Sequence, residues 1–240
     1  MLKVLVLGAS GATGQKVVAQ LLSKNATIFA VVRTPGVFAT LTSQYPSLSE
    51  VIGDVSTWSV DDFCQQLAEC DVVISCLGHN LTLKGIFGQP RRLVTQTIDK
   101  VLTAINSLEK SNKTKLILMN TTGNANRGIP EVPELSQRIV VSILRYTLPP
   151  HVDNEQAADV LRRNIKPNHA YIEWVTVRPD TLTDDQQLSS YEVFESPIRN
   201  AIFNAGETSR VNVAHFMASL ASDHDLWERW KGKMPVIYNG

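Results

Sequence analysis

The amino-acid sequence predicts an α/β fold built on a doubly wound parallel sheet, and two observations support this prediction. Short aliphatic runs alternate with longer amphipathic stretches along the whole chain, which is the pattern of repeated strand–helix–strand units. The first run, residues 3–7, is almost entirely aliphatic and leads directly into a glycine-rich turn. Parallel strands that are covered on both faces read as continuous apolar runs of this kind.

In the first half of the chain, the spacing of the apolar residues and the capping residues predict the strands and helices. Predicted strands cover residues 3–7, 27–32, 50–52, 71–77 and 115–119. A helix over residues 12–23 follows the first strand, and Ser59 is expected to cap a later helix. Pro90, a favoured first-turn residue, is predicted to open a long helix whose apolar side chains repeat at helical spacing as far as Leu108.

The second half shows the same alternation until about residue 180. A helix over 135–144 is predicted to stop before Pro149 and Pro150, and Asp153 is expected to cap the next helix with Gln156 three residues on. A sixth strand covers 171–177, a mixture of loops and short strands covers 181–209, a helix covers 213–222 and a last short strand covers 236–238. We expect one domain over residues 1–240, in which about 180–240 contributes the substrate pocket or a lid.

Composition excludes several classes of function. The formal net charge is zero, so long-range electrostatics favour neither nucleic acid nor an anionic membrane as a partner. No apolar run is long enough to span a bilayer. The three cysteines, Cys64, Cys70 and Cys76, and the five histidines show no metal-ligand spacing. We therefore expect a cytoplasmic protein without a metal. A monomer or a weak homodimer is a separate expectation that composition does not decide.

The turn Gly8-Ala9-Ser10-Gly11-Ala12-Thr13-Gly14 carries the chemistry. Its glycines follow a predicted strand and open a predicted helix, which is the context of a dinucleotide site. Gly8 permits a tight turn, Gly11 lets the backbone approach a pyrophosphate, and Gly14 allows close helix–strand packing. The unpaired N–H groups at the start of the helix then face the phosphates.

The end of the second predicted strand indicates which dinucleotide is bound. NAD sites usually place Asp or Glu there, whereas this chain has Arg33 followed by Thr34. A guanidinium suits the 2′-phosphate of NADP(H), because it forms paired, charge-assisted hydrogen bonds with phosphate oxygens. We therefore expect NADP(H) to be preferred over NAD(H). The alternative is a solvated surface arginine.

Several segments, taken in order, resemble the atypical short-chain dehydrogenase/reductases. The nearest branch looks like the NAD(P)H-binding group that includes flavin reductase/biliverdin-IXβ reductase and the NmrA-like proteins, all with a Rossmann-type fold. The resemblance extends over about residues 1–213. It rests on the glycine turn and on four further segments: Val32-Arg33-Thr34-Pro35, Gly53-Asp54-Val55, Cys76-Leu77-Gly78 and Trp174-Val175-Thr176-Val177-Arg178-Pro179.

The resemblance implies further cofactor contacts from residues that follow strands. These are Asp54 and Val55 beside the adenine, Leu77 and Gly78 against the middle of the cofactor, Thr121 and Thr122 near the nicotinamide, and Pro179 beside the same pocket. With Ser10, Ala12, Thr13 and the glycines of the turn, they form the expected cofactor site. The alternatives are a turn residue at 54 and strand caps at 121 and 122.

The chain departs from the larger family at the catalytic dyad, because none of its five tyrosines has a lysine four residues on. An NAD-dependent epimerase, which needs Tyr-x-x-x-Lys, is therefore disfavoured. Two hypotheses remain: an NADPH-dependent oxidoreductase acting on a small planar acceptor such as a flavin or quinone, and a non-catalytic NADP(H)-sensing regulator of NmrA-like type. The catalytic residue stays open, with Thr122, Tyr146 and His151 as candidates and His79 as a further possible proton donor.

Overall fold

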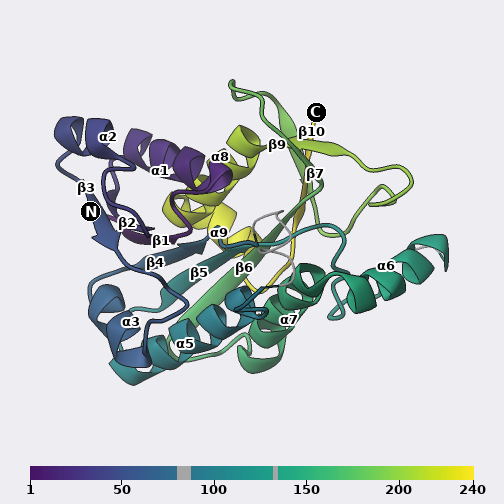
Figure 1. The fold of residues 1–240 in the computed structure, drawn as a ribbon, viewed down its shortest axis with the longest axis horizontal. Helices are drawn as coiled ribbons and strands as arrows, with labels where there is room; N and C mark the ends of the chain where they lie inside the picture. Colours follow the sequence, from purple (N-terminus) through teal and green to yellow (C-terminus); the bar gives the residue numbers. More distant parts are fainter. Residues whose placement is uncertain (80–87, 132–134) are drawn as a thin grey trace.

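The computed structural model describes residues 1–79, 88–131 and 135–240, and it contains an eight-stranded sheet (Figure 1). Its strands are β1 (Lys3–Leu7), β2 (Thr27–Val32), β3 (Leu48–Ile52), β4 (Val72–Ser75), β5 (Thr114–Met119), β6 (Ile172–Pro179), β8 (Tyr191–Phe194) and β10 (Val236–Asn239). Their order is β3-β2-β1-β4-β5-β6-β10-β8, and only the pairing of β8 with β10 is antiparallel. The predicted doubly wound parallel sheet is confirmed.

Helices cover both faces of this sheet (Figure 1). One layer contains α1 (Ala12–Ser23), α2 (Ala39–Gln44), α8 (Arg210–Ser222) and α9 (His224–Trp230); the other contains α3 (Val60–Leu67), α5 (Leu93–Leu108) and α7 (Pro149–Asn164). Successive residues of β1 point to opposite faces, so Val4 and Val6 join the core beneath α1 and α8 while Leu5 and Leu7 join the core beneath α3 and α5. This alternation explains why the strand is apolar throughout.

The C-terminal part extends both the sheet and the helix layers. α8 packs on α1, and β10 adds to the sheet beside β6. A small second sheet pairs β7 (Thr181–Thr183) with β9 (Glu207–Ser209). The mixture of loops and short strands predicted for 181–209 is confirmed, whereas α9 has no counterpart in the sequence prediction.

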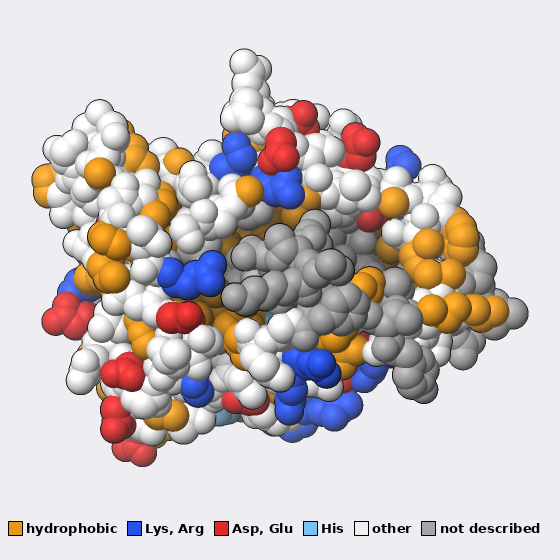
Figure 2. Space-filling model, viewed as in Figure 1, with side chains coloured by type: hydrophobic (Ala, Val, Ile, Leu, Met, Phe, Trp, Pro, Cys, Tyr) orange, Lys and Arg blue, Asp and Glu red, His pale blue; other side chains and the backbone are white. Residues whose placement is uncertain are grey.

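One helix, α6 (Leu135–Thr147), extends away from the body of the molecule (Figure 1). Ile139 and Ile143 are each 55% exposed on it. Hydrophobic side chains accordingly gather on the surface at that end of the molecule (Figure 2). No helix in the three described ranges is both long enough and apolar enough to cross a membrane.

The prediction that Asp153 caps its own helix is wrong, and the difference matters for the site. α7 already begins at Pro149, because proline is well suited to a first helical turn. Asp153 therefore lies inside α7, and its carboxylate accepts the N–H groups of Val94 and Thr95 at 2.8 and 2.9 Å. It thus caps α5, which begins at Leu93 rather than at the predicted Pro90.

A buried arginine holds the end of β6 to the loop that follows β5. Arg178 is fully buried, and its two terminal nitrogens donate to the carboxylate of Glu131 at 2.7 and 2.8 Å. The same guanidinium donates to the carbonyls of Met234 and Asn124. A charge in such a place needs all of these partners, because an unpaired buried charge is strongly destabilising.

We predict that Glu131→Gln lowers the free energy of unfolding by about 3–5 kcal/mol, because it leaves the Arg178 guanidinium buried without its counter-charge. The measurement is urea denaturation followed by circular dichroism. Glu69→Gln is the control, because Glu69 forms an exposed ion pair with Lys3 and should leave the midpoint unchanged. Equal midpoints for the two variants would contradict the assigned role of Arg178.

Candidate functional site

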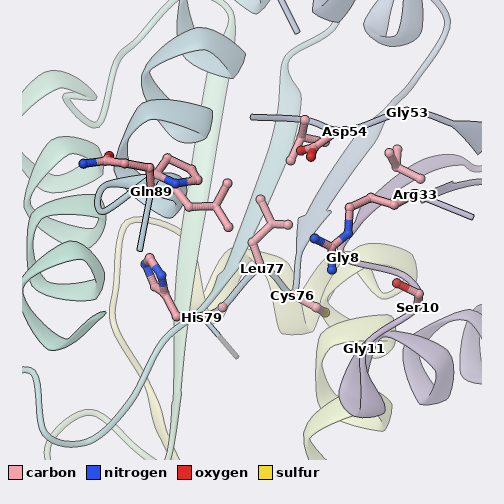
Figure 3. A pocket seen from close by; sticks show the side chains of 15 residues that line it. Gly8, Ser10, Gly11, Arg33, Gly53, Asp54, Cys76, Leu77, His79 and Gln89 are labelled. Carbon is pink, nitrogen blue, oxygen red and sulfur yellow. The ribbon is translucent and has the colours of Figure 1, made fainter. Parts of the chain in front are cut away.

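A cavity of about 320 Å³ opens at the carboxyl ends of the first four strands (Figure 3). Its lining comes chiefly from residues that directly follow β1, β2, β3 and β4, together with the segment before α5. The lining residues are Gly8, Ser10, Gly11, Val31, Arg33, Gly53, Asp54, Val55, Cys76, Leu77, Gly78, His79, Gln89, Pro90 and Leu93. Ligands of open α/β sheets bind at this edge, outside the carboxyl ends of the strands.

The glycine turn is as tight as the sequence predicts. Gly8 has φ +73°, and a Cβ on it would lie 2.9 Å from the carbonyl carbon of Cys76. A Cβ on Gly14 would lie 2.2 Å from the carbonyl oxygen of Gly8. The first turn of α1 therefore packs directly on the end of β1, at a distance that only glycine permits.

This packing places the start of α1 beside the cavity. Gly11 is the N-cap residue of α1 and provides no side-chain hydrogen bond to the helix. Its carbonyl oxygen accepts the first hydrogen bond within the helix, which the N–H of Gln15 donates at 2.9 Å. The preceding N–H groups at the helix start have no intrahelical acceptor, and the positive end of the helix dipole lies with them. This arrangement favours an anion in the cavity.

Arg33 and Asp54 lie together at one end of the cavity (Figure 3). Hydrogen bonds from the hydroxyl and N–H groups of Ser56 hold the pKa of Asp54 below its usual value, and the charge of Arg33 adds to the effect. Gly53 is required beside them, because a Cβ there would lie 2.6 Å from Nε1 of Trp58. One fixed carboxylate and one guanidinium therefore face the same end of the space.

His79 and Gln89 lie at the opposite end (Figure 3). Nε2 of His79 is 2.8 Å from Oδ2 of Asp153, and both side chains are almost completely buried. The histidine is thereby connected to the start of α5 through the carboxylate that caps this helix. Neither Gln89 nor the link between His79 and Asp153 was predicted from the sequence.

The other predicted contact residues are not part of the described wall of the cavity. Ala12, Thr13 and Gly14 form the first turn of α1 directly behind Gly11, and Thr34 follows Arg33. Thr121 and Pro179 stand at the ends of β5 and β6, neighbouring strands farther along the sheet. The cavity thus brings together the predicted residues that follow β1 to β4, namely Gly8, Ser10, Gly11, Arg33, Asp54, Val55, Leu77 and Gly78.

Thr122 is only 3% exposed, and its polar groups are engaged with the end of β6. Its N–H donates to the carbonyl oxygen of Pro179 at 3.0 Å, and its hydroxyl hydrogen-bonds the carboxyl of Asp180. Burial raises the pKa of that carboxyl above its usual value, although these hydrogen bonds oppose the shift. The hydroxyl of Thr122 is therefore held within the fold.

Of the remaining catalytic candidates, the structure describes the side chain of His151 but not that of Tyr146. His151 lies on α7 beside Gly123, and burial lowers the pKa of its imidazole. Its Nε2 is buried and has no hydrogen-bond partner among the described residues. The backbone of Tyr146 belongs to α6, but its side chain lies outside the described residues.

Some lining residues had a signal in the sequence and others had none. Cys76 and His79 flank the Leu77-Gly78 pair that the resemblance singled out, so both positions could have been included. Burial raises the pKa of the Cys76 thiol to about 12, which leaves it protonated and unreactive. Three further lining residues lie at or just before the start of α5, namely Gln89, Pro90 and Leu93. No local pattern in the sequence indicates that this segment lines the cavity.

We predict that Gly14→Ala destabilises the fold by about 1–3 kcal/mol and removes binding of nicotinamide dinucleotides, because the new methyl group displaces the Gly8 carbonyl. Thermal denaturation and calorimetry with NADPH measure the two effects. Gly123→Ala is the matched control, since a Cβ there meets only ordinary contacts at 3.6 Å or more. Unchanged NADPH binding by Gly14→Ala would contradict the assigned role of the turn.

Comparison with solved structures shows that the whole fold is shared. The chain is similar to a provisionally named NADH-flavin reductase from Streptococcus pneumoniae, with TM-score 0.65, 17% identity and full coverage of both chains. It is similar to ChuY, an anaerobillin reductase from Escherichia coli, with TM-score 0.66 and 15% identity over 99% of this chain and 97% of that one.

A third similar structure is a wide-type short-chain dehydrogenase/reductase from Veillonella parvula in complex with NADP. Its TM-score is 0.66 and its identity 15%, over 99% of this chain and 94% of that one. A search of curated proteins gave no sequence match. At these identities the likeness concerns the fold.

The family model described as NAD(P)H-binding matches residues 8–224, which is most of the chain. The matched segment begins at the first glycine of the turn and extends through α8 to the start of α9. This confirms the resemblance to the NAD(P)H-binding group of atypical short-chain dehydrogenase/reductases. The chain belongs to the NAD(P)H-binding family.

Proposed function

We propose that this protein is an NADPH-dependent oxidoreductase that reduces a small planar acceptor such as a flavin or a quinone. The observation that carries the proposal is the cavity that joins the glycine turn, Arg33 and a buried histidine at one edge of the sheet. NADPH supplies a hydride to such an acceptor. The absence of a Tyr-x-x-x-Lys motif fits acceptors that are easily reduced and need no tyrosine to act on an alcohol.

The glycine turn fits the cofactor's diphosphate. A Cβ at Gly8 or Gly14 would meet backbone atoms at 2.9 Å or less, so the turn packs directly on Cys76 after β4 and α1 starts directly against the turn. We propose that Ser10, Gly11 and the N–H groups of Ala12, Thr13 and Gly14 hold the diphosphate. Leu77 and Gly78, which follow β4, would contact the middle of the cofactor.

Arg33 supports a preference for NADP(H). It lies at the end of β2, where an acidic residue would bind the 2′-hydroxyl of NAD, and its side chain lines the cavity. Asp54 is the nearby carboxylate, and its hydrogen bonds to Ser56 direct it into its own turn. We propose that Arg33 and Thr34 bind the 2′-phosphate while Asp54 and Val55 lie beside the adenine.

The acceptor would bind beyond the nicotinamide, toward the ends of β5 and β6. Thr121 and Pro179 stand at these strand ends, and residues from Asp180 onward continue from there into β7. We propose that the C-terminal part, about 180–240, contributes the acceptor side of the pocket.

The protein is proposed to act in the cytoplasm as a monomer or weak homodimer. The similar structures include one named as an anaerobillin reductase and one bound to NADP.

A non-catalytic NADP(H)-sensing regulator is the second candidate. The observation that favours it is that the hydroxyl of Thr122, at the end of β5, is held by Asp180 within the fold. Such a protein would bind the cofactor through the same cavity without transferring a hydride. Binding alone therefore does not separate the two functions, but turnover does.

We predict that the purified protein oxidises NADPH, followed by absorbance, in the presence of at least one acceptor from a panel of riboflavin, FMN and menadione. NADPH without an acceptor is the control and should remain stable. A protein that binds NADPH tightly and never oxidises it with any of the three would contradict the reductase function and favour the regulator.

We predict that Arg33→Ala weakens NADPH binding by about 10- to 150-fold, the value of one charge-assisted phosphate contact, and leaves NADH binding unchanged. Calorimetric titration with both cofactors measures this difference. Arg163→Ala is the matched control, because Arg163 is an exposed arginine on α7. Equal losses for the two cofactors, or no loss, would contradict recognition of the 2′-phosphate.

A further inference from the structure

We propose that Glu50 positions the loop that recognises the 2′-phosphate, and that its carboxylate thereby sets the preference for NADP(H) over NAD(H). The inference rests on the proposed function, in which Arg33 and Thr34 bind this phosphate. It adds a positioning residue that lies on β3 and is not part of the described wall of the cavity.

The carboxylate of Glu50 is engaged with the loop between β2 and α2. Its Oε2 accepts the N–H of Gly36 at 2.7 Å, and its Oε1 accepts the N–H of Phe38 at 2.5 Å. Hydrogen bonds to a carboxylate are shorter and stronger than those between neutral groups. One side chain therefore holds the loop at two points, shortly after Arg33 and Thr34 in the chain.

The register of the sheet explains why Glu50 reaches this loop. β3 is the outer strand beside β2, and Glu50 is paired with Ala30. Leu48, two residues before Glu50, belongs to the core beneath α1 and α8, so the side chain of Glu50 points to the same face. Phe38 packs into that core and is 4% exposed. The loop thus folds back from the end of β2 over the face on which Glu50 lies.

The side chain of Arg33 lies on the cavity side of this loop. It lines the cavity (Figure 3), as does Val31 two residues earlier, which belongs to the core on the opposite face of the sheet. The carboxylate and the guanidinium therefore act from different sides of the sheet. Glu50 can fix the loop without taking the guanidinium that a phosphate would need.

The loop itself contains features that require such support. Gly36 has φ +83°, in the left-handed region, and a glycine gives an unrestrained chain many alternative conformations. The backbone hydrogen bond from the N–H of Ala39 to the carbonyl oxygen of Gly36 is long, at 3.3 Å. Pro35 has no N–H to donate. The two short hydrogen bonds to Glu50 therefore select one conformation of the loop.

A loop that is already ordered binds its ligand more tightly. When Arg33 and Thr34 are held in place before the cofactor arrives, the binding energy is not spent on the entropy of ordering them. NADH has a hydroxyl where NADPH has the phosphate, so it gains little from a fixed guanidinium. Loss of the two hydrogen bonds to Glu50 should then weaken the binding of NADPH selectively.

The sign of this effect distinguishes positioning by Glu50 from simple charge repulsion. Glu50→Gln removes a negative charge from the neighbourhood of the proposed phosphate site. Repulsion alone would then make the binding of NADPH tighter in the variant. Loss of positioning makes it weaker, because a glutamine amide keeps only one of the two acceptor oxygens.

The test is calorimetric titration of the wild type, Glu50→Gln and the control Glu192→Gln with NADPH and with NADH. We expect Glu50→Gln to weaken NADPH binding by about 10-fold, the loss of one charge-assisted hydrogen bond, and to leave NADH binding unchanged. Glu192 is exposed on β8, the strand at the opposite edge of the sheet, and its variant should match the wild type with both cofactors.

A double-mutant cycle shows whether Glu50 acts through Arg33. In the Arg33→Ala background, Glu50→Gln should cause little further loss of NADPH affinity, because the contact that it positions is already gone. A purely structural role of Glu50 would give the same loss in both backgrounds.

Hydrogen exchange of the unliganded protein gives a readout that does not depend on the cofactor. The amides of Gly36 and Phe38 should be protected in the wild type and should exchange faster in Glu50→Gln, while the amides of β2 keep their protection. Rapid exchange of both loop amides in the wild type would show that the loop is not ordered in advance and would overturn the inference.

Three calorimetric results would also overturn it while leaving the reductase function intact. These are unchanged or tighter NADPH binding by Glu50→Gln, equal losses for NADPH and NADH, and additive losses in the double variant. Failure of Arg33→Ala to discriminate between the two cofactors would instead overturn the NADP(H) preference, and the role of Glu50 with it. A wild-type protein that binds neither cofactor would overturn the proposed function itself.

Discussion

The close approach of α1 to the end of β1 is the constraint on which the rest of the site depends. A Cβ at Gly14 would lie 2.2 Å from the carbonyl oxygen of Gly8, so no other residue permits the helix to start so near the strand. This approach places the start of α1 beside the cavity, whose lining includes its N-cap residue Gly11. Because β2, β3 and β4 run parallel to β1, the residues that follow them reach the same edge of the sheet.

Two buried carboxylates organise the other side of the site. Asp153 joins α7 to the start of α5 and to His79, and Glu131 joins the loop after β5 to Arg178 at the end of β6. Each carboxylate meets backbone N–H donors as well as a side-chain partner. Charges that are satisfied in this way can remain in a nearly dry interior.

The sequence predicted best what depends on neighbours in the chain. The bounds of β1, α1 and β2 agree with the prediction residue by residue, because a strand, a glycine turn and an amphipathic helix each have a local pattern. Ser59 caps α3 as predicted, through a capping box with Asp62. The residues that follow β1 to β4 meet in one cavity, because neighbouring parallel strands have their carboxyl ends at the same edge of the sheet.

The features that could not be predicted from the sequence depend on contacts between distant segments of the chain. Asp153 has the local pattern of a helix cap, and it does cap a helix, but the N–H that it accepts belongs to Val94, 59 positions earlier in the chain. The interaction of the Thr122 hydroxyl with Asp180 likewise joins segments that are far apart in the sequence, and the predicted place of Thr122 beside the nicotinamide stays a prediction. The spacing of apolar residues and the capping rules each describe a single helix or strand, so they do not indicate which helices and strands pack together.

The most direct test of the account is the set of backbone amide signals that move when NADPH is added to the ¹⁵N-labelled protein. The account predicts large shifts for residues 10–14 and for Arg33, and none in the separate cleft lined by Thr103, Asn164 and His169. Saturation with NADPH that leaves the amides of 10–14 unmoved would contradict it.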